Sequence, residues 1–276
     1  MSNLKEIKKK IYSINSVIKT TEAMKMISIS ELKKYKKLLN HIVIYMNYME
    51  LLFIDLTKLE KNIFFLEKRK NGKKLFIIFT SDKGLCGSFN FLIFEKIIQI
   101  IKEKDLNYEN FMFFPIGKKG IDFIYEKKLN NYWNYIFSLK KIKIFVSKII
   151  KDFCKKKISS IYLIYHSFKK NKIVIEKLLP IILYKKNHSK FGINPILESS
   201  KKKIFNYFIH NFISIKLRKI FLESMSSEHT FRMISMNKAT DNASEIKKDL
   251  ILNYNKERQN TITKEILEII SGLESI

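Results

Sequence analysis

The sequence predicts an α/β fold in which the N- and C-terminal helices form a long antiparallel coiled coil and a small α/β domain lies between them in the chain. Nine of the ten Gly and Pro residues lie between Gly72 and Pro195, and both types break helices. The first segment carries a heptad period, and the middle alternates strand-like with helix-like runs. The predicted domains are an N-terminal coiled-coil helix over 1–60, a central α/β domain over 72–195 and a C-terminal coiled-coil helix over 200–276.

The N-terminal segment contains a seam whose positions follow alternating steps of four and three residues, which indicates a left-handed coiled coil. Thr21, Lys25 and Ser28 make this seam polar at three consecutive positions, while the apolar residues at 23, 24, 26 and 27 lie off it. Two interpretations stay open: a loosened or otherwise packed stretch, or a helix face turned towards another partner. The seam comprises Ile7, Ile11, Ile14, Ile18, Thr21, Lys25, Ser28, Leu32, Tyr35, Leu39, Ile42, Met46, Met49, Phe53 and Leu56.

The middle of the chain is typical of a small parallel or mixed sheet with helices on its faces. The loop Thr80–Asn90 follows the first strand, where phosphates often bind, but it lacks both glycine-rich nucleotide motifs. This favours a tight turn in which Gly84 and Gly87 supply unusual dihedrals. The predicted strands are Lys73–Phe79, Phe111–Ile116 and a hairpin of Ile158–Phe168 with Ile173–Leu183; the predicted helices are Phe91–Lys104, Lys118–Lys128 and Lys141–Lys157.

The C-terminal segment repeats the heptad pattern from Leu222 to Leu250, with Ala239 and Ala243 allowing close backbone approach. Between Leu250 and Ile262 the pattern slips in phase, and a new apolar stripe then ends the chain. In an antiparallel pair, the off-seam apolar side chains near both ends would be exposed unless other subunits surrounded them. The terminal stripe consists of Ile262, Ile266, Ile269 and Leu273.

The formal charge of +27 makes a nucleic-acid partner a candidate. The lysines are nevertheless scattered rather than clustered, and the abundant Lys, Ile, Asn, Phe and Tyr are residues that AT-rich codons encode. The segment from Leu222 to Ile276 holds seven Lys/Arg and nine Asp/Glu, so the end of the chain is slightly acidic. Coding bias therefore explains the basicity better than a nucleic-acid ligand does.

The sequence contains no convincing catalytic or metal-binding constellation. Its five histidines lack metal-ligand spacing, and two cysteines cannot form a disulfide framework. Cys86 lies in a glycine-bearing turn without a nearby histidine, so a packed residue is favoured over a nucleophile, and Cys154 falls within a predicted helix. No uncharged run approaches the roughly 20 residues of a membrane span. We expect no catalytic residues, cofactor or metal.

Six runs of the chain carry a recognisable pattern: Glu22–Ile27, Thr80–Asn90, Pro115–Gly120, Ser227–Met236, Ala239–Ala243 and Tyr254–Ile266. These runs resemble the gamma subunits of F-type ATP synthases, and the resemblance extends from end to end. The chain departs from the family pattern at Phe231, where a small residue is common, at Ser88, where the turn usually has a second glycine, and at Leu273, where alanine is usual. These departures concern local packing.

The resemblance implies a central rotor shaft that couples proton flow through the membrane ring to conformational cycling and ATP synthesis in the catalytic subunits. One copy per complex would stand within a ring of alpha and beta subunits, and its Rossmann-like domain would lie beside epsilon and the c-ring. The chain itself would not be an enzyme. Because no mitochondrial-type leader precedes the first helix, we expect a bacterial or plastid-encoded protein, located peripherally at the cytoplasmic face of the bacterial inner membrane. The alternatives are a free-standing basic coiled-coil scaffold that binds nucleic acid and a small α/β enzyme using Cys86.

The resemblance also places partner contacts on both terminal helices. Met24 and Lys25 would meet a mobile loop of a beta subunit, with Glu228 and Arg232 packed alongside. Farther along the C-terminal helix, upper polar contacts to the surrounding subunits would come from Arg258, Gln259, Thr263 and Glu265.

Overall fold

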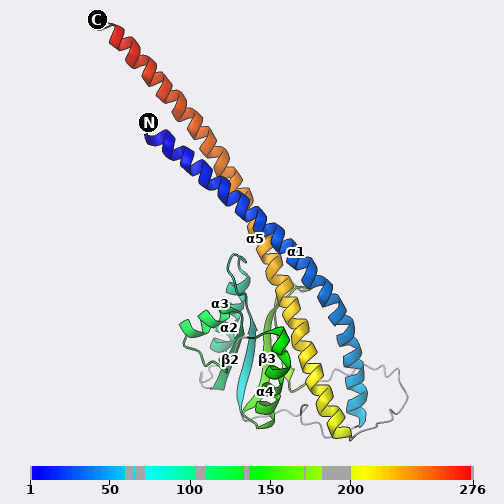
Figure 1. Ribbon diagram of the computed structural model, residues 1–276. Coiled ribbons are helices and arrows are strands. Elements are labelled where there is room, and N and C mark those ends of the chain that lie inside the picture. The colour runs from blue at the N-terminus through cyan, green and yellow to red at the C-terminus, as the bar shows by residue number, and fades with distance from the viewer. Residues whose placement is uncertain are drawn as a thin grey trace. The chain divides into compact units, whose positions relative to one another are not determined.

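The computed structural model describes residues 2–59, 65, 72–103, 110–133, 137–170, 172–181 and 200–274 (Figure 1). The chain divides into two compact units: a helical unit of Met1–Ser30 with Arg232–Ile276, and an α/β unit of Glu31–Phe231. The described elements are the helices α1 (Ser2–Leu59), α2 (Phe89–Glu103), α3 (Lys118–Glu126), α4 (Ile142–Cys154) and α5 (Lys201–Glu274), the short 3₁₀ helix η2 (Leu139–Lys141), and the strands β1 (Lys73–Phe79), β2 (Phe111–Ile116), β3 (Ile158–Ser167) and β4 (Lys172–Leu179).

The α/β unit contains a mixed four-stranded sheet in the order β2-β1-β3-β4. β1 pairs in parallel with both β2 and β3, whereas β4 pairs antiparallel to β3. The five consecutive residues Leu75–Phe79 are all buried, because helices cover both faces of this central strand. The predicted mixed α/β domain is confirmed.

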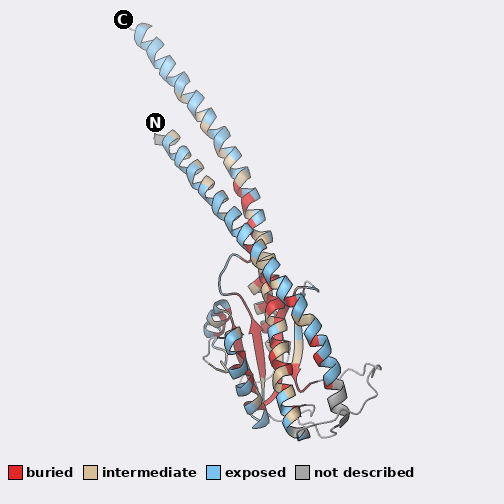
Figure 2. Cartoon of the chain, turned by 45° about the vertical axis from the view of Figure 1, so that its right-hand side comes forward, coloured by how far each residue is buried: buried red, intermediate tan, exposed pale blue. Residues whose placement is uncertain are grey.

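Alternate residues of β1 face two separate cores. Leu75 and Ile77 belong to a core formed with α1, α4 and α5, and Phe76 belongs to a core formed with α2 and α3. Figure 2 shows buried residues along the strands of the sheet and on parts of the helices beside it. The α/β unit therefore has α2 and α3 on one face, and α4 with the first part of α5 on the other.

The predicted strand bounds of β1 and β2 are confirmed, but the predictions for α3 and α4 overran their ends. Both helices end in a Schellman motif, with Lys128 (φ 51°) and Lys156 (φ 59°) in the left-handed conformation. At the end of α4, the N–H of Lys157 donates to the carbonyl of Asp152 at 3.1 Å. Because lysine stands at both positions where glycine is usual, no helix-breaking residue type marks these two ends. The second strand of the predicted hairpin also overran, because β4 ends at Leu179 and the described residues 180 and 181 lie outside it. The predicted end itself, Leu183, lies outside the described residues.

The predicted N-terminal seam is confirmed as far as the described side chains extend. Every seam residue from Ile7 to Phe53 is partly or fully buried. Within the α/β unit, the rings of Phe53 and Phe212 stack at 5.0 Å, and those of Tyr35 and His229 stack at 5.5 Å. A residue later in α1 therefore contacts a residue earlier in α5. α1 and α5 therefore run antiparallel, as Figure 1 shows.

The predicted phase slip after Leu250 is wrong for the packed face of α5. Within the helical unit, α5 continues past the N-terminus of α1 (Figure 1), so the stripe from Ile262 to Leu273 has no length of α1 beside it and is exposed. Past Leu250, the large apolar residues lie on a different face of α5 from the residues that pack against α1. The packed face keeps its spacing but carries mostly polar residues. After Ala243, partly buried residues keep the steps of four and three at Lys247, Leu250, Tyr254, Glu257 and Thr261.

Candidate partner-contact surface

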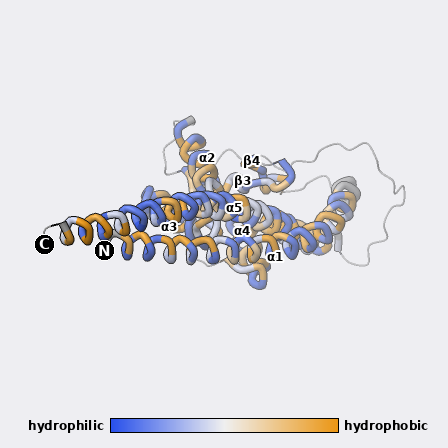
Figure 3. The backbone as a smooth tube through the Cα atoms, turned by 90° about the horizontal axis from the view of Figure 1, so that it is seen from above, coloured by the Kyte–Doolittle hydropathy of each residue, from blue (hydrophilic) through white to orange (hydrophobic). Residues whose placement is uncertain are grey.

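The helical unit exposes many large apolar side chains on both of its helices. Figure 3, which colours the backbone by hydropathy, shows hydrophobic and hydrophilic residues alternating along both helices. Met26 and Ile27 are each 62% exposed, and Leu273 is 70% exposed. Burial of one such side chain stabilises by about 1.5–3 kcal/mol, so a large surface of this kind is typical of a protein–protein interface. The exposed set is Tyr12, Val17, Met24, Met26 and Ile27 on α1, with Ile234, Ile246, Ile251, Leu252, Ile262, Ile266, Leu267, Ile269, Ile270 and Leu273 on α5.

The polar part of the seam is a set of hydrogen bonds between α1 and α5. Thr240 Oγ1 donates to Thr21 Oγ1 at 2.8 Å, and Lys25 Nζ donates to Asn237 Oδ1 at 3.2 Å. Ser28 is 1% exposed and donates to the carbonyl of Met24 in its own helix. The stretch therefore remains on the seam, and each polar group there has a partner.

Aromatic stacking continues the pairing of α1 and α5 within the α/β unit. Tyr35 lies nearly parallel to His229, with an interplanar angle of 16°. Burial, with a smaller contribution from Glu31, raises the pKa of the Tyr35 hydroxyl. Tyr35 therefore stays neutral at physiological pH and acts as a packing residue.

The structure places the first four predicted contact residues in unequal environments. Met24 is 40% exposed on the outer face of α1, whereas Lys25 lies on the seam with Asn237. Glu228 is only 5% exposed within the α/β unit, and Arg232 is partly buried. Of these four side chains, Met24 is the most available to another subunit.

The other four predicted contact residues border the terminal apolar stripe of α5. Arg258, Gln259, Thr263 and Glu265 are all exposed, and Thr263 Oγ1 donates to the carbonyl of Gln259 at 2.9 Å. At 3.6 residues per turn, Arg258 and Glu265 lie along one side of the stripe and Gln259 and Thr263 along the other. An apolar band with polar borders resembles the core and rim of an interface.

The sequence did not identify Asn237 and Thr240, the α5 residues that bond to the polar seam. Thr240 lies one position from Ala239, which the heptad pattern assigned to the seam, so a one-residue shift concealed it. No residue type marks Thr240 as a contact in the sequence. Only the structure reveals it, because its side chain is 8% exposed and its hydroxyl donates to a residue of α1.

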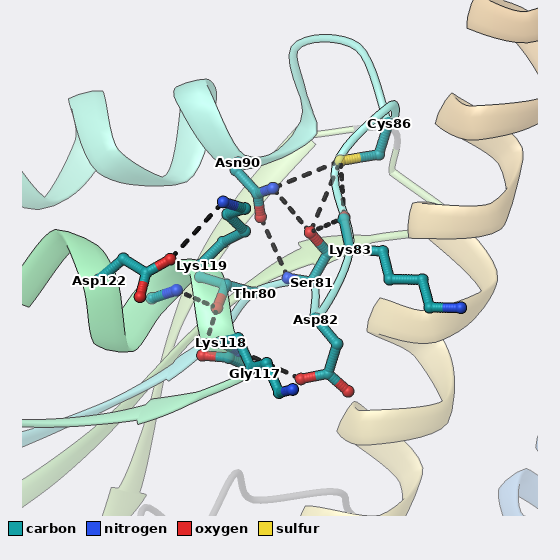
Figure 4. Close-up of polar contacts among 11 residues, drawn as sticks. Thr80, Ser81, Asp82, Lys83, Cys86, Asn90, Gly117, Lys118, Lys119 and Asp122 are labelled. Carbon is teal, nitrogen blue, oxygen red and sulfur yellow. Dashed lines mark hydrogen bonds and ion pairs between the residues drawn. The ribbon is translucent and has the colours of Figure 1, made fainter.

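The loop after β1 is organised by its own hydrogen bonds and by contacts to the start of α3 (Figure 4). The backbone N–H groups of Lys118, Lys119 and Gly120 donate to Asp82 Oδ1 at 3.1 Å, the Ser81 carbonyl at 3.1 Å and Thr80 Oγ1 at 2.9 Å. These three donors form the first turn of α3, a position that often binds phosphate in other proteins. The loop therefore caps α3.

The predicted role of Gly84 in this turn is wrong, while that of Gly87 is confirmed. Gly87 has φ 56°, but the other residue with positive φ in the loop is Leu85 (φ 63°) rather than Gly84. Leu85 is 60% exposed, so its side chain clears the loop despite the left-handed backbone. The turn depends on one glycine at this end.

Cys86 packs inside the same loop. Its side chain is 3% exposed, and Asn90 Nδ2 donates to Cys86 Sγ at 3.3 Å (Figure 4). Asn90 also donates to Ser81 Oγ at 2.7 Å and accepts from the Ser81 N–H at 3.1 Å. Cys86 thus completes the interior of the turn.

The described part of the chain offers neither a metal-binding cluster nor a membrane-crossing helix. No group of three or more His, Cys, Asp or Glu side chains there is arranged to hold a metal ion. Among the described helices, none combines the length and the apolarity needed to cross a bilayer.

Comparison with known sequences gives matches over the full length. The family model described as ATP synthase matches residues 3–276. The ATP synthase gamma chain of Geobacter metallireducens is 32% identical over 288 residues, covering 100% of this chain and 99% of the relative. The ATP synthase gamma chain of Flavobacterium johnsoniae is 35% identical over 288 residues, with the same coverage of 100% and 99%.

Comparison with solved structures gives the same architecture at lower identity. A chain of the Euglena gracilis mitochondrial ATP synthase, from a structure of OSCP/F1/c-ring, aligns with a TM-score of 0.64 and 14% identity, covering 99% of this chain and 94% of that chain. A chain of the Tetrahymena thermophila mitochondrial ATP synthase central stalk/c-ring aligns with a TM-score of 0.58 and 21% identity, covering 80% and 99%. These two likenesses concern the fold.

Proposed function

The chain belongs to the family of ATP synthase gamma chains, and we propose that it works as the central shaft of the rotor. The shaft couples proton flow through the membrane ring to conformational cycling and ATP synthesis in the alpha and beta subunits. The observation that carries this proposal is the helical unit, in which two antiparallel helices expose apolar side chains along their outer faces. Such a surface fits a shaft enclosed by other subunits.

The partners follow from the two kinds of surface. We place alpha and beta subunits around the helical unit, because its apolar stripe needs cover. Epsilon and the c-ring would contact the α/β unit; in support, solved neighbours of the same fold come from assemblies named as rotor and as central stalk with c-ring. One copy would serve each complex, peripherally at the cytoplasmic face of a bacterial inner membrane.

The proposed contacts are the eight predicted residues. Met24 and Lys25 would meet a mobile beta loop, with Glu228 and Arg232 supporting that region from α5. Arg258, Gln259, Thr263 and Glu265 would provide polar contacts beside the apolar stripe. A hydrogen bond or partly buried ion pair at these positions is worth at most a few kcal/mol, which allows a contact to break and reform during rotation. Nucleotide chemistry would belong to the partner subunits.

Co-expression with the alpha and beta subunits tests this function. We expect one copy of this chain to co-purify with three alpha and three beta subunits, and the complex to hydrolyse ATP. The full-length chain without partners should aggregate through its exposed stripe. A monodisperse chain that fails to bind alpha and beta would overturn the proposal.

The nucleic-acid alternative has no support from the comparisons, whose matches are ATP synthase gamma chains. A direct measurement separates the two readings. A nucleic-acid scaffold would bind duplex DNA with an affinity that falls steeply with salt, and it would do so without partner subunits. The rotor function requires no such binding.

A further inference from the structure

The sheet of the α/β unit has a switch point between β1 and β3. These two strands are parallel neighbours, but the chain leaves β1 towards β2 on one side and leaves β3 towards β4 on the other. In open α/β sheets, the crevice outside the carboxyl ends of two such strands is where ligands bind. What fills this position therefore bears on what the unit does.

Here α5 occupies the crevice. Ser227 of α5 forms a 2.7 Å hydrogen bond with Nδ1 of His166, near the carboxyl end of β3. The ring of Phe231 lies 4.7 Å from that of His166 and 5.9 Å from that of Phe89, the first residue of α2. Ser227, His166 and Phe89 are 2%, 1% and 0% exposed. The ring of Phe231 thus covers the start of α2, which would face a ligand bound in the crevice.

Two further polar links connect α5 with the hairpin of β3 and β4. Ser167 Oγ donates to Glu223 Oε1 at 2.6 Å, and Lys216 Nζ lies 2.7 Å from Glu176 Oε1. Ser167 and Glu223 are 3% and 7% exposed, so water competes little for their bond. Lys216, Glu223 and Ser227 follow one another at seven and four residues, a spacing that aligns them on one face of α5.

The contacts that α1 makes in the same unit are of another kind. Met46, Met49 and Phe53 pack in the apolar core, and Phe53 stacks on Phe212 of α5. Apolar packing is non-directional, whereas a buried hydrogen bond fixes the position and orientation of both partners. Helix α1 also reaches the hairpin through Lys36, whose Nζ lies 5.7 Å from the centroid of the Phe168 ring. Among the contacts described, the hydrogen bonds and the ion pair to the strands of the sheet come from α5.

We propose that the bonds of Lys216, Glu223 and Ser227 to Glu176, Ser167 and His166 form a joint that fixes α5 in the ligand crevice of the sheet and passes torque between the sheet and α5. This joint rests on the proposed rotor function and assigns the path of torque within it. A crevice that takes ligands in other α/β proteins serves here as a mechanical seat.

The test compares Ser167→Ala/Ser227→Ala with Ser226→Ala in the complete, membrane-reconstituted ATP synthase. Ser226 is a matched control, because it is 0% exposed and adjacent, but its hydroxyl donates to Leu222 within α5. We expect the double variant to pump at least about twofold fewer protons per ATP hydrolysed, and Ser226→Ala to pump normally. Equal pumping by the double variant and the wild type would overturn the joint, while a wild-type chain that never assembles would overturn the rotor function itself.

A second comparison tests the joint without assembly, in case the double variant does not form the complex. Glu223→Gln keeps an oxygen acceptor for Ser167, whereas Glu223→Ala removes it. Hydrogen exchange on the full-length chain should show faster exchange of α5 residues 216–231 in Glu223→Ala and near-normal exchange in Glu223→Gln. Identical exchange in both variants and the wild type would overturn the joint.

Discussion

Gly117 makes the tightest backbone approach around the loop after β1. It has φ 106°, and a Cβ added there would clash with the backbone carbonyl oxygen of Thr80. We predict that Gly117→Ala lowers the free energy of unfolding by more than about 2 kcal/mol, because strain and a backbone clash combine. Urea unfolding of the full-length chain measures this.

Gly84→Ala is the matched control for that substitution. No atom lies within 4 Å of an added Cβ at Gly84, and its backbone is not left-handed. We expect the free energy of unfolding to change by less than about 1 kcal/mol, because the site has room for a Cβ and alanine restricts the unfolded chain. Equal losses in the two variants would contradict the assignment of strain to Gly117.

His166 gives the α/β unit a pH-dependent stability. Burial lowers the pKa of its imidazole below the ordinary value of 6.5. Below about pH 6.5 the unfolded chain takes up a proton that the folded chain resists. The contribution of His166 to stability is therefore present above that pH and is lost as pH falls through the folded-state pKa, by at most about 1.4 kcal/mol per pH unit.

The measurement is unfolding free energy at pH 7.5 and pH 5.5. His166→Asn should show a smaller drop between these two values than the wild-type chain does. His41→Gln serves as the control, because His41 is exposed on α1 and should leave the drop unchanged. A full-sized drop in His166→Asn would assign the pH dependence to other groups.

At the residue scale, sequence reasoning found one side of the polar seam. The heptad pattern placed Lys25 and Thr21 on it because periodicity within one helix is local. Their partners Asn237 and Thr240 depend on how two helices slide against each other. That register depends on how the side chains of the two helices pack together, and no short motif encodes it.

Within α1, we predict that apolar seam residues outweigh polar ones in stability. Lys25→Ala removes a largely exposed hydrogen bond to Asn237 and should cost no more than about 1 kcal/mol. Met46→Ala removes a side chain that is 1% exposed and should cost about 2–5 kcal/mol. Urea unfolding of both full-length variants checks the order, and a larger loss for Lys25→Ala would contradict it.

At the end of α5, we predict that the exposed stripe serves assembly rather than folding. Ile266 is 51% exposed, so Ile266→Glu should change unfolding stability by less than about 0.5 kcal/mol. If alpha and beta subunits cover it, the same change should weaken assembly about tenfold or more, because a buried charge replaces an apolar contact.

Titration of the full-length chain with alpha and beta subunits, followed by size-exclusion chromatography, measures that loss. Asn260→Glu adds the same charge at an exposed position of α5 outside the stripe and should assemble nearly normally. Normal assembly of Ile266→Glu would show that no partner covers the stripe at this point.

Element types were predictable from the sequence, but their ends and exposed faces were less so. β1 and β2 were found to the residue because continuous apolar runs mark buried strands. α3 and α4 ended earlier than expected, since Lys128 and Lys156 adopt a conformation that sequence rules associate with glycine. The phase of α5 was misread because its seam past Leu250 carries Tyr254, Glu257 and Thr261.

For the whole molecule, composition and periodicity gave the architecture but not the function. A heptad seam and an alternating middle segment predict two long helices and an α/β domain for physical reasons that hold in any protein. Neither the formal net charge of +27 nor the residues of the loop Thr80–Asn90 identify partner subunits. The function was predicted only from the resemblance of runs such as Ser227–Met236 to a known family. The full-length match to ATP synthase gamma chains then confirmed that resemblance.

The central claim is that this chain turns inside its partners, and a label on Cys154 tests it most directly. Cys154 is exposed and Cys86 is buried, so a thiol-reactive probe selects Cys154 in a complex with cysteine-free alpha and beta subunits, and Cys154→Ser provides the unlabelled control. With the alpha and beta subunits immobilised and ATP supplied, we predict that the probe rotates in one direction. A probe that stays fixed while the complex hydrolyses ATP would contradict the account.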